Sequence, residues 1–184
     1  MLMKRIIAAV ICIALLLTGC SFKPDTLDAN YVGEGQMTVL RYLINSNAFL
    51  VEDIFVENHL PTETGKDITN ESGTFSPVVS NEIGTYDELR AALEATYTKE
   101  AADKILSESD RYTEIDGKLY FNTKYSESDA EDYDWNETDI KVISVADGTY
   151  ELEISVKKVH GLKQKFTVKA VTVNGDIRLE DMFY

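Results

Sequence analysis

The chain has 184 residues, a formal net charge of −14 at pH 7, two cysteines and two histidines. A surface this acidic repels nucleic acid and anionic lipid head groups, so we expect neither as a partner and expect a cationic partner instead. A solvated acidic exterior that only keeps the domain soluble is the common alternative.

The first twenty residues have the pattern of a bacterial lipoprotein signal. Lys4 and Arg5 precede an apolar run from Ile6 to Leu17, which is too short for a stable membrane span. The run ends in Leu-Thr-Gly-Cys, which resembles a lipobox and predicts cleavage between Gly19 and Cys20, with a diacylglycerol on the Cys20 thiol. The alternative is an ordinary signal peptide in which the cysteine is incidental.

This processing divides the chain into a signal peptide (1–19), a flexible tether (20–35) and a single α+β domain (36–184). Cleavage removes Lys4 and Arg5 and no acidic residue, so the net charge of −14 becomes −16. The mature domain then has no free thiol, which excludes thiol catalysis and a Cys/His zinc site. We therefore assign no catalytic residue, metal ligand or cofactor, and expect a lipid-anchored domain on the outer face of the cell membrane.

The first part of the domain has helical periodicity. Asn45-Ser46-Asn47 interrupts the pattern, so the sequence predicts either one long helix or a helix and a second segment. The apolar stripe is interpreted as core rather than as a membrane-lying face, because the polar side carries acids and no row of lysines. The stripe comprises Met37, Leu40, Leu43, Ile44, Leu50, Val51, Ile54 and Phe55.

Proline and helix-capping residues indicate where strands and helices begin and end in the middle of the chain. Residues 63–71 are predicted to form an exposed loop, and 74–79 a strand that Pro77 confines to a sheet edge or a bulge. Thr85 with Glu88 forms a capping box, and Thr98 is a second N-cap, which predicts helices at about 85–96 and 98–107. Their apolar faces need a sheet to cover.

After Asp110 the hydrophobic period changes from helical to two. Asp-Gly or Asn-Gly pairs at 116–117, 147–148 and 174–175 are strong signals for tight hairpin turns. They separate predicted strands at 112–115, 118–121, 139–145, 150–159, 165–173 and 176–183. The predicted fold is α+β, with N-terminal helical segments and a short helical hairpin packed on one curved, cone-like antiparallel β-meander.

Residues 122–138 are predicted to be irregular and carry the candidate contact surface. Asp129, Glu131, Asp132 and Asp134 are proposed to steer a basic partner, and Tyr133 or Trp135 to supply a desolvated anchor. Trp135 capping the core of the sheet is the alternative. A calcium loop is disfavoured because the acidic run lacks a turn glycine.

Several segments resemble the IseA family of DL-endopeptidase inhibitors from Gram-positive bacteria. The resemblance rests on Tyr86-Asp87-Glu88-Leu89-Arg90, on 97–102, on 115–120 and on 174–179, and it covers about residues 72–184. Ile177 stands where the family pattern has tryptophan, and the N-terminal half matches poorly. The order of elements is also similar to the cone-shaped nuclear-transport-factor-like fold, whose curved sheet often encloses a ligand pocket.

The resemblance implies inhibition of basic, secreted cysteine peptidases that cut peptidoglycan stem peptides. Two other functions stay open. One is a solute- or wall-fragment-binding lipoprotein with a pocket between helices and sheet, and the other is a hydrolase that uses carboxylates alone. An inhibitor needs an exposed aromatic and acidic patch, whereas a binding module needs a deep apolar concavity.

Overall fold

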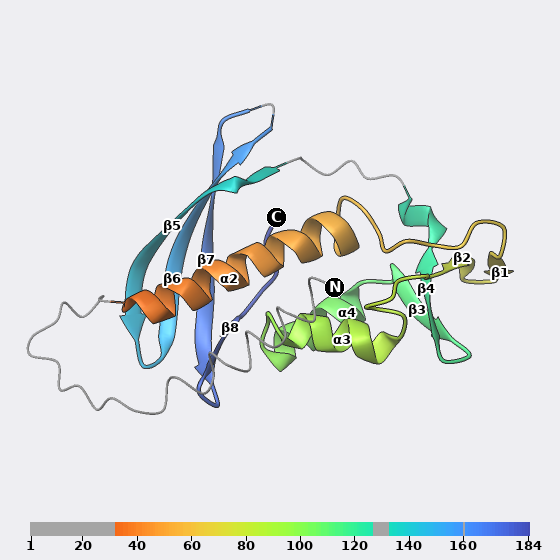
Figure 1. Cartoon of the computed structure of the whole chain (residues 1–184), viewed down its shortest axis with the longest axis horizontal. Coiled ribbons are helices and arrows are strands. Elements are labelled where there is room, and N and C mark those ends of the chain that lie inside the picture. Colours follow the sequence, from red (N-terminus) through yellow and green to blue (C-terminus); the bar gives the residue numbers. More distant parts are fainter. Residues whose placement is uncertain (1–31, 127–132, 160) are drawn as a thin grey trace, which may run out of the picture.

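A computed structural model describes residues 32–126, 133–159 and 161–184. Within these ranges the chain is α+β, with three α-helices and two four-stranded antiparallel sheets, one of them curled into a half-barrel. Figure 1 shows the curled sheet at one end of the molecule, the smaller sheet at the other, and the helices between them. The predicted fold class is confirmed.

The N-terminal helical segment is continuous. Helix α2 runs from Glu34 to Leu50 and passes directly into a π-helical turn, η1, at Val51–Phe55. The helix therefore begins two residues inside the predicted tether. Asn47, which the sequence suggested as an interruption, is a fully buried helical residue instead.

Helices α3 (Tyr86–Glu94) and α4 (Lys99–Glu108) form the predicted helical hairpin. The Thr85 hydroxyl accepts from the Glu88 N–H at 3.2 Å, and the Glu88 carboxylate accepts from the Thr85 N–H at 3.0 Å, so both halves of the capping box are present. The Glu88 carboxylate also accepts from the Gly84 N–H and from the Thr85 hydroxyl, and these two hydrogen bonds, the one from Gly84 first, lower the pKa of Glu88.

The curled sheet is a meander of four strands in the order β5-β6-β7-β8. The strands are β5 (Tyr133–Ala146), β6 (Thr149–Lys158), β7 (Lys163–Val173) and β8 (Asp176–Leu179). Asp147 and Asn174 have φ of 50° and 53°, and the glycines that follow them also have positive φ, as the predicted Asp-Gly and Asn-Gly turns require. Alternate residues of β6, from Tyr150 to Val156, are buried on the concave face.

The hairpin at 112–121 does not join this meander. Strands β3 (Tyr112–Ile115) and β4 (Lys118–Asn122) pair with β2 (Gly73–Pro77) and β1 (Ile68–Asn70) in a separate sheet of order β1-β2-β4-β3. Strand β1 lies inside the segment predicted as a loop, which corrects that prediction. Periodicity identifies a strand but not its partner, because pairing is set by tertiary packing.

Strand β2 is central in the smaller sheet, although it contains Pro77. The Val78 N–H donates to Leu119 of β4, whereas the Pro77 carbonyl accepts from Glu63 on the opposite side. The proline nitrogen thus faces away from β4 and costs no hydrogen bond of that ladder. The prediction that Pro77 confines this strand to a sheet edge or a bulge is therefore wrong, because β2 lies between β1 and β4 and Pro77 is its last residue.

One hydrophobic cluster runs through the helices and both sheets. It includes Leu40 and Ile54 of the first helical segment, Leu93 of α3, Leu119 of the smaller sheet and Leu152 of the meander, all with no measurable exposure. The turn between α3 and α4 also completes the meander, because Thr98 donates to the Leu179 carbonyl and Leu179 donates to the Thr96 carbonyl. That turn covers the outer edge of β8.

Candidate functional site

A polar groove of about 800 Å³ lies between the first helical segment and the start of β5. Its helical wall is one face of α2 and η1, with residues spaced three and four apart as a single helix face requires. This wall comprises Arg41, Asn45, Ala48, Phe49, Glu52 and Asp53. The strand wall comprises Tyr133, Trp135, Asn136, Thr138, Asp139 and Ile140.

A large β-bulge shapes the strand wall. Asp134 pairs with Lys157 and Asp139 pairs with Ser155, so four residues of β5 oppose one residue of β6. The Thr138 hydroxyl donates to the Trp135 carbonyl at 2.6 Å, which closes the bulge into a compact turn. Bulges re-aim side chains, and this one places Asn136 and Thr138 in the wall of the groove.

Trp135 belongs to the core rather than to an exposed contact surface. It is 8% exposed, packs with Ala48 and Val156, and has the Phe166 and Phe183 rings at 6.5 and 5.9 Å between centroids. Its indole Nε1 is buried and donates to no acceptor of the described chain. The prediction of an irregular segment up to residue 138 is wrong here, because β5 starts at Tyr133. The alternative, that Trp135 caps the core of the sheet, is confirmed.

The other predicted contact residues fall into two groups. Tyr133 and Asp134 are partly exposed at the start of β5, with the Tyr133 ring 5.6 Å from that of Trp135. The Asp134 carboxylate accepts from the Asn136 N–H at 3.2 Å, so it also stabilises the bulge. Asp129, Glu131 and Asp132 lie outside the described residues, as do Gly19 and Cys20.

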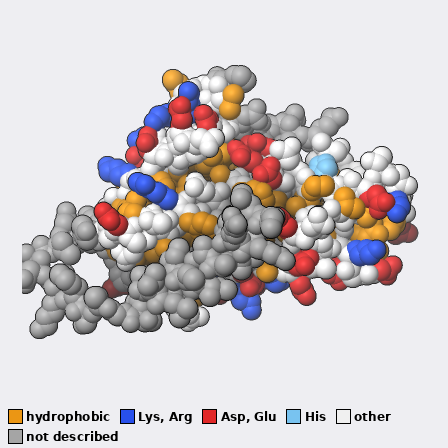
Figure 2. Space-filling model, viewed as in Figure 1, with side chains coloured by type: hydrophobic (Ala, Val, Ile, Leu, Met, Phe, Trp, Pro, Cys, Tyr) orange, Lys and Arg blue, Asp and Glu red, His pale blue; other side chains and the backbone are white. Residues whose placement is uncertain are grey.

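The charges of the groove are unevenly distributed. Arg41 is exposed near the middle of α2, and Glu52 and Asp53 follow on η1 about three helical turns later. Across the groove, Lys163 donates to Asp139 at 2.6 Å, and this hydrogen bond lowers the pKa of the Asp139 carboxyl. Figure 2 shows acidic and basic side chains close together over the meander.

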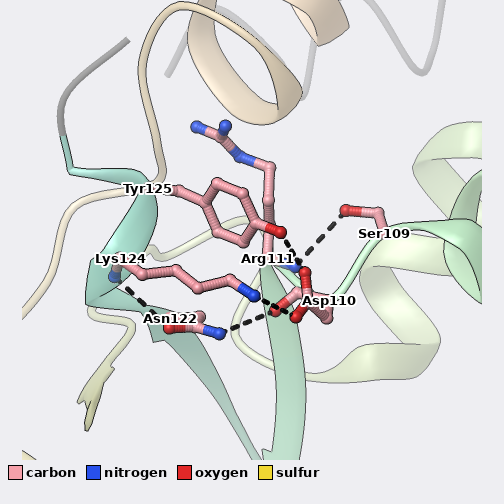
Figure 3. A network of polar contacts seen from close by, with 6 residues as sticks. All are labelled: Ser109, Asp110, Arg111, Asn122, Lys124 and Tyr125. Atoms are coloured by element: carbon pink, nitrogen blue, oxygen red, sulfur yellow. Dashed lines mark hydrogen bonds and ion pairs between the residues drawn. The ribbon is translucent and has the colours of Figure 1, made fainter. Parts of the chain in front are cut away.

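A second polar cluster lies on the smaller sheet, just before the acid-rich segment (Figure 3). The Asp110 carboxylate accepts from Lys124 and from the Tyr125 hydroxyl. The hydrogen bond from Lys124, then that from Tyr125, lowers the pKa of Asp110. Arg111 points away from this carboxylate, donates to the Asn58 carbonyl at 2.9 Å and lies 5.0 Å from the Tyr125 ring centroid. The cluster ties the turn Thr123–Tyr125 to the hairpin, and we interpret it as structural.

The helical wall of the groove is the part that sequence reasoning missed. Arg41, Asn45, Phe49 and Asp53 recur every four residues along α2 and η1, a spacing that places them on one face. Phe49 was the available signal, because a large aromatic residue on the polar side of an amphipathic helix is unusual. It is 48% exposed.

No protein-family model matches the chain, and no curated protein is similar enough to be counted as a relative. Within the described residues, no helix is both long and apolar enough to cross a bilayer. The function is therefore argued from the groove and its residues.

Proposed function

We propose that the chain is an extracytoplasmic, lipid-anchored inhibitor of basic cysteine peptidases that cut peptidoglycan stem peptides. The proposal joins the lipobox-like Leu17–Cys20 and the resemblance of residues 72–184 to one structural observation. That observation is a polar groove whose walls combine the exposed ring of Phe49 and the partly exposed ring of Tyr133 with carboxylates at the surface. Acidic groups steer a basic partner during approach, and aromatic groups supply the area that is desolvated on contact.

The polar character of the groove favours an inhibitor over a protein that encloses an apolar solute. The concave face of the meander is filled by core side chains such as Leu152 and Ile154, which pack in the same cluster as α2. The groove beside it is lined mainly by charged, amide and hydroxyl side chains. The aromatic rings of Phe49 and Tyr133 lie between these polar groups. An exposed surface of this composition suits a protein contact more than the enclosure of an apolar solute.

Binding of a soluble wall fragment is the second candidate. The observation that favours it is the volume of about 800 Å³, which falls in the range of small-molecule sites, roughly 300–1,000 Å³. The groove also lies between a helix and a sheet, as that alternative requires.

The test is to incubate the full-length, membrane-anchored protein with wall peptidases secreted by its host and to measure stem-peptide release. Inhibition that saturates with increasing protein supports the proposal. Unchanged release at saturating protein, together with direct binding of purified wall fragments, would reject the inhibitor and favour the second candidate.

Two variants separate steering from anchoring. Asp53→Asn should chiefly slow association and reduce its salt dependence, because exposed charges act through a field screened over roughly 10 Å at 0.1 M salt. Tyr133→Ala should chiefly speed dissociation, by about 2 kcal/mol if the ring is a hot spot. Glu82→Gln is the matched control, an exposed acid in the loop before α3 that lies outside the groove.

A further inference from the structure

We infer that the groove recognises an extended peptide segment of about five residues that carries a cationic group at one end and an anionic group at the other. This inference rests on the proposed function and specifies the ligand of the same site. It follows from the length of the groove, from the charges at its two ends and from the groups between them.

The length of the groove is set by its helical wall. Arg41 and Asp53 are twelve residues apart on one helical face, which corresponds to roughly 18 Å at 1.5 Å per residue. An extended peptide advances about 3.3 Å per residue, so about five residues span this distance. The volume of about 800 Å³ leaves room for a ligand of this kind.

The two ends of the helical wall have opposite charge. Arg41 provides a guanidinium at one end, and Asp53, beside Glu52, provides a carboxylate at the other. Within the described parts of the chain, neither Arg41 nor Asp53 forms an ion pair or a side-chain hydrogen bond. Charged groups that have no partner among the described residues can pair with oppositely charged ends of a ligand.

The groups between the ends suit a peptide backbone and one apolar side chain. Asn45 and Asn136 face the groove from opposite walls, and their amides offer both donors and acceptors. The Thr138 hydroxyl donates within the bulge and keeps acceptor capacity. Phe49, 48% exposed, provides an aromatic surface. Trp135 lines the opposite wall, and its buried indole N–H has no acceptor among the described residues.

Such a peptide has two sources in the cell wall, a surface segment of the partner peptidase or the stem peptide of the wall itself. Both present amide backbone with amine and carboxylate groups, so the groove chemistry is shared. The experiment below includes one arm for each source.

The test uses the full-length protein and four fluorescent five-residue peptides with blocked ends and three central alanines. Their end residues are lysine with glutamate, lysine with lysine, glutamate with glutamate, and serine with serine. Fluorescence anisotropy should show that the lysine–glutamate peptide binds at least tenfold more tightly than any other. Equal affinity for all four would overturn the inference.

Charge reversal at each end supplies a readout that a merely structural role would not change. Arg41→Glu should transfer the preference to the double-lysine peptide, and Asp53→Lys should transfer it to the double-glutamate peptide. Lys99→Glu on α4 and Glu82→Lys before α3 make the same charge changes at exposed positions outside the groove, and should leave the preference unaltered. A preference that shifts equally in the controls would show a non-specific field effect and would overturn the inference.

Competition assigns the source. Displacement of the labelled peptide by peptidase assigns a protein segment, and displacement by purified stem peptide assigns the wall. Inhibition that persists when a non-displaceable peptide occupies the groove would refute the groove as the peptidase contact and leave the proposed function intact. Charge-dependent peptide binding without any inhibition would keep the inference and reject the proposed function.

Discussion

Asn47 holds together three parts of the fold that are far apart in the sequence. It is fully buried in α2, and its Oδ1 accepts from the Tyr97 hydroxyl at 2.8 Å and from the Phe183 N–H at 3.2 Å. Its Nδ2 donates to the Phe183 carbonyl at 3.0 Å. Helix α2, the turn between α3 and α4, and the C-terminal segment therefore meet at one amide.

Replacing Asn47 with alanine should be strongly destabilising. The change removes three hydrogen bonds of about 1 kcal/mol each and leaves the buried Tyr97 hydroxyl without its acceptor. We expect a loss of about 3–4 kcal/mol in the free energy of unfolding. Tyr97→Phe removes only one of the three bonds and leaves Asn47 paired with Phe183, so about 1 kcal/mol is expected.

Urea unfolding followed by circular dichroism and by the fluorescence of the single tryptophan measures both losses. Asn45→Ala is the matched control, because Asn45 is exposed on the same helix and its replacement should change stability by less than about 0.5 kcal/mol. If Asn47→Ala were no more destabilising than Asn45→Ala, the amide would not be the junction of these three parts. In a double-mutant cycle, Asn47 and Tyr97 should also show coupling of about 1 kcal/mol.

Three further outcomes follow from local structure. Thr85→Ala should lower the free energy of unfolding by about 1 kcal/mol, because α3 loses its N-cap, whereas Thr85→Ser should retain it. The pKa of Asp110 is lowered in the folded state, so the carboxylate stabilises the fold fully above its unfolded pKa, and this contribution is lost as the pH falls through the folded pKa. Asp110→Asn should therefore reduce the dependence of the free energy of unfolding on pH in this acidic range. Urea titrations at a series of pH values measure that dependence. Gly148→Ala should destabilise the meander, measured by thermal unfolding, because φ is +76° at that position and the new Cβ would meet the Thr172 side chain at 3.4 Å.

The helix starts and hairpin turns of this protein follow from interactions between residues close together in the sequence, so they can be predicted from the sequence alone. The capping box at Thr85 and Glu88 predicted the start of α3, and the Asp-Gly and Asn-Gly pairs predicted the tight turns of the hairpins. Each signal depends on residues within about four positions of one another, so the rest of the fold does not alter it. The same holds for the helical stripe that became the buried side of α2.

Only the tertiary structure determined which distant helices and strands pack or pair with one another. The hairpin 112–121 paired with β2 rather than with the meander, and Asn47 became a core residue because two distant segments bring it hydrogen-bonding groups. The β-bulge turned Trp135 into the core, while Arg41, Phe49 and Asp53 met the start of β5 across a groove. Periodicity shows which face of an element is apolar, but not what covers it. Burial of apolar surface is non-directional, so the partner of each face is settled only when all the faces pack together.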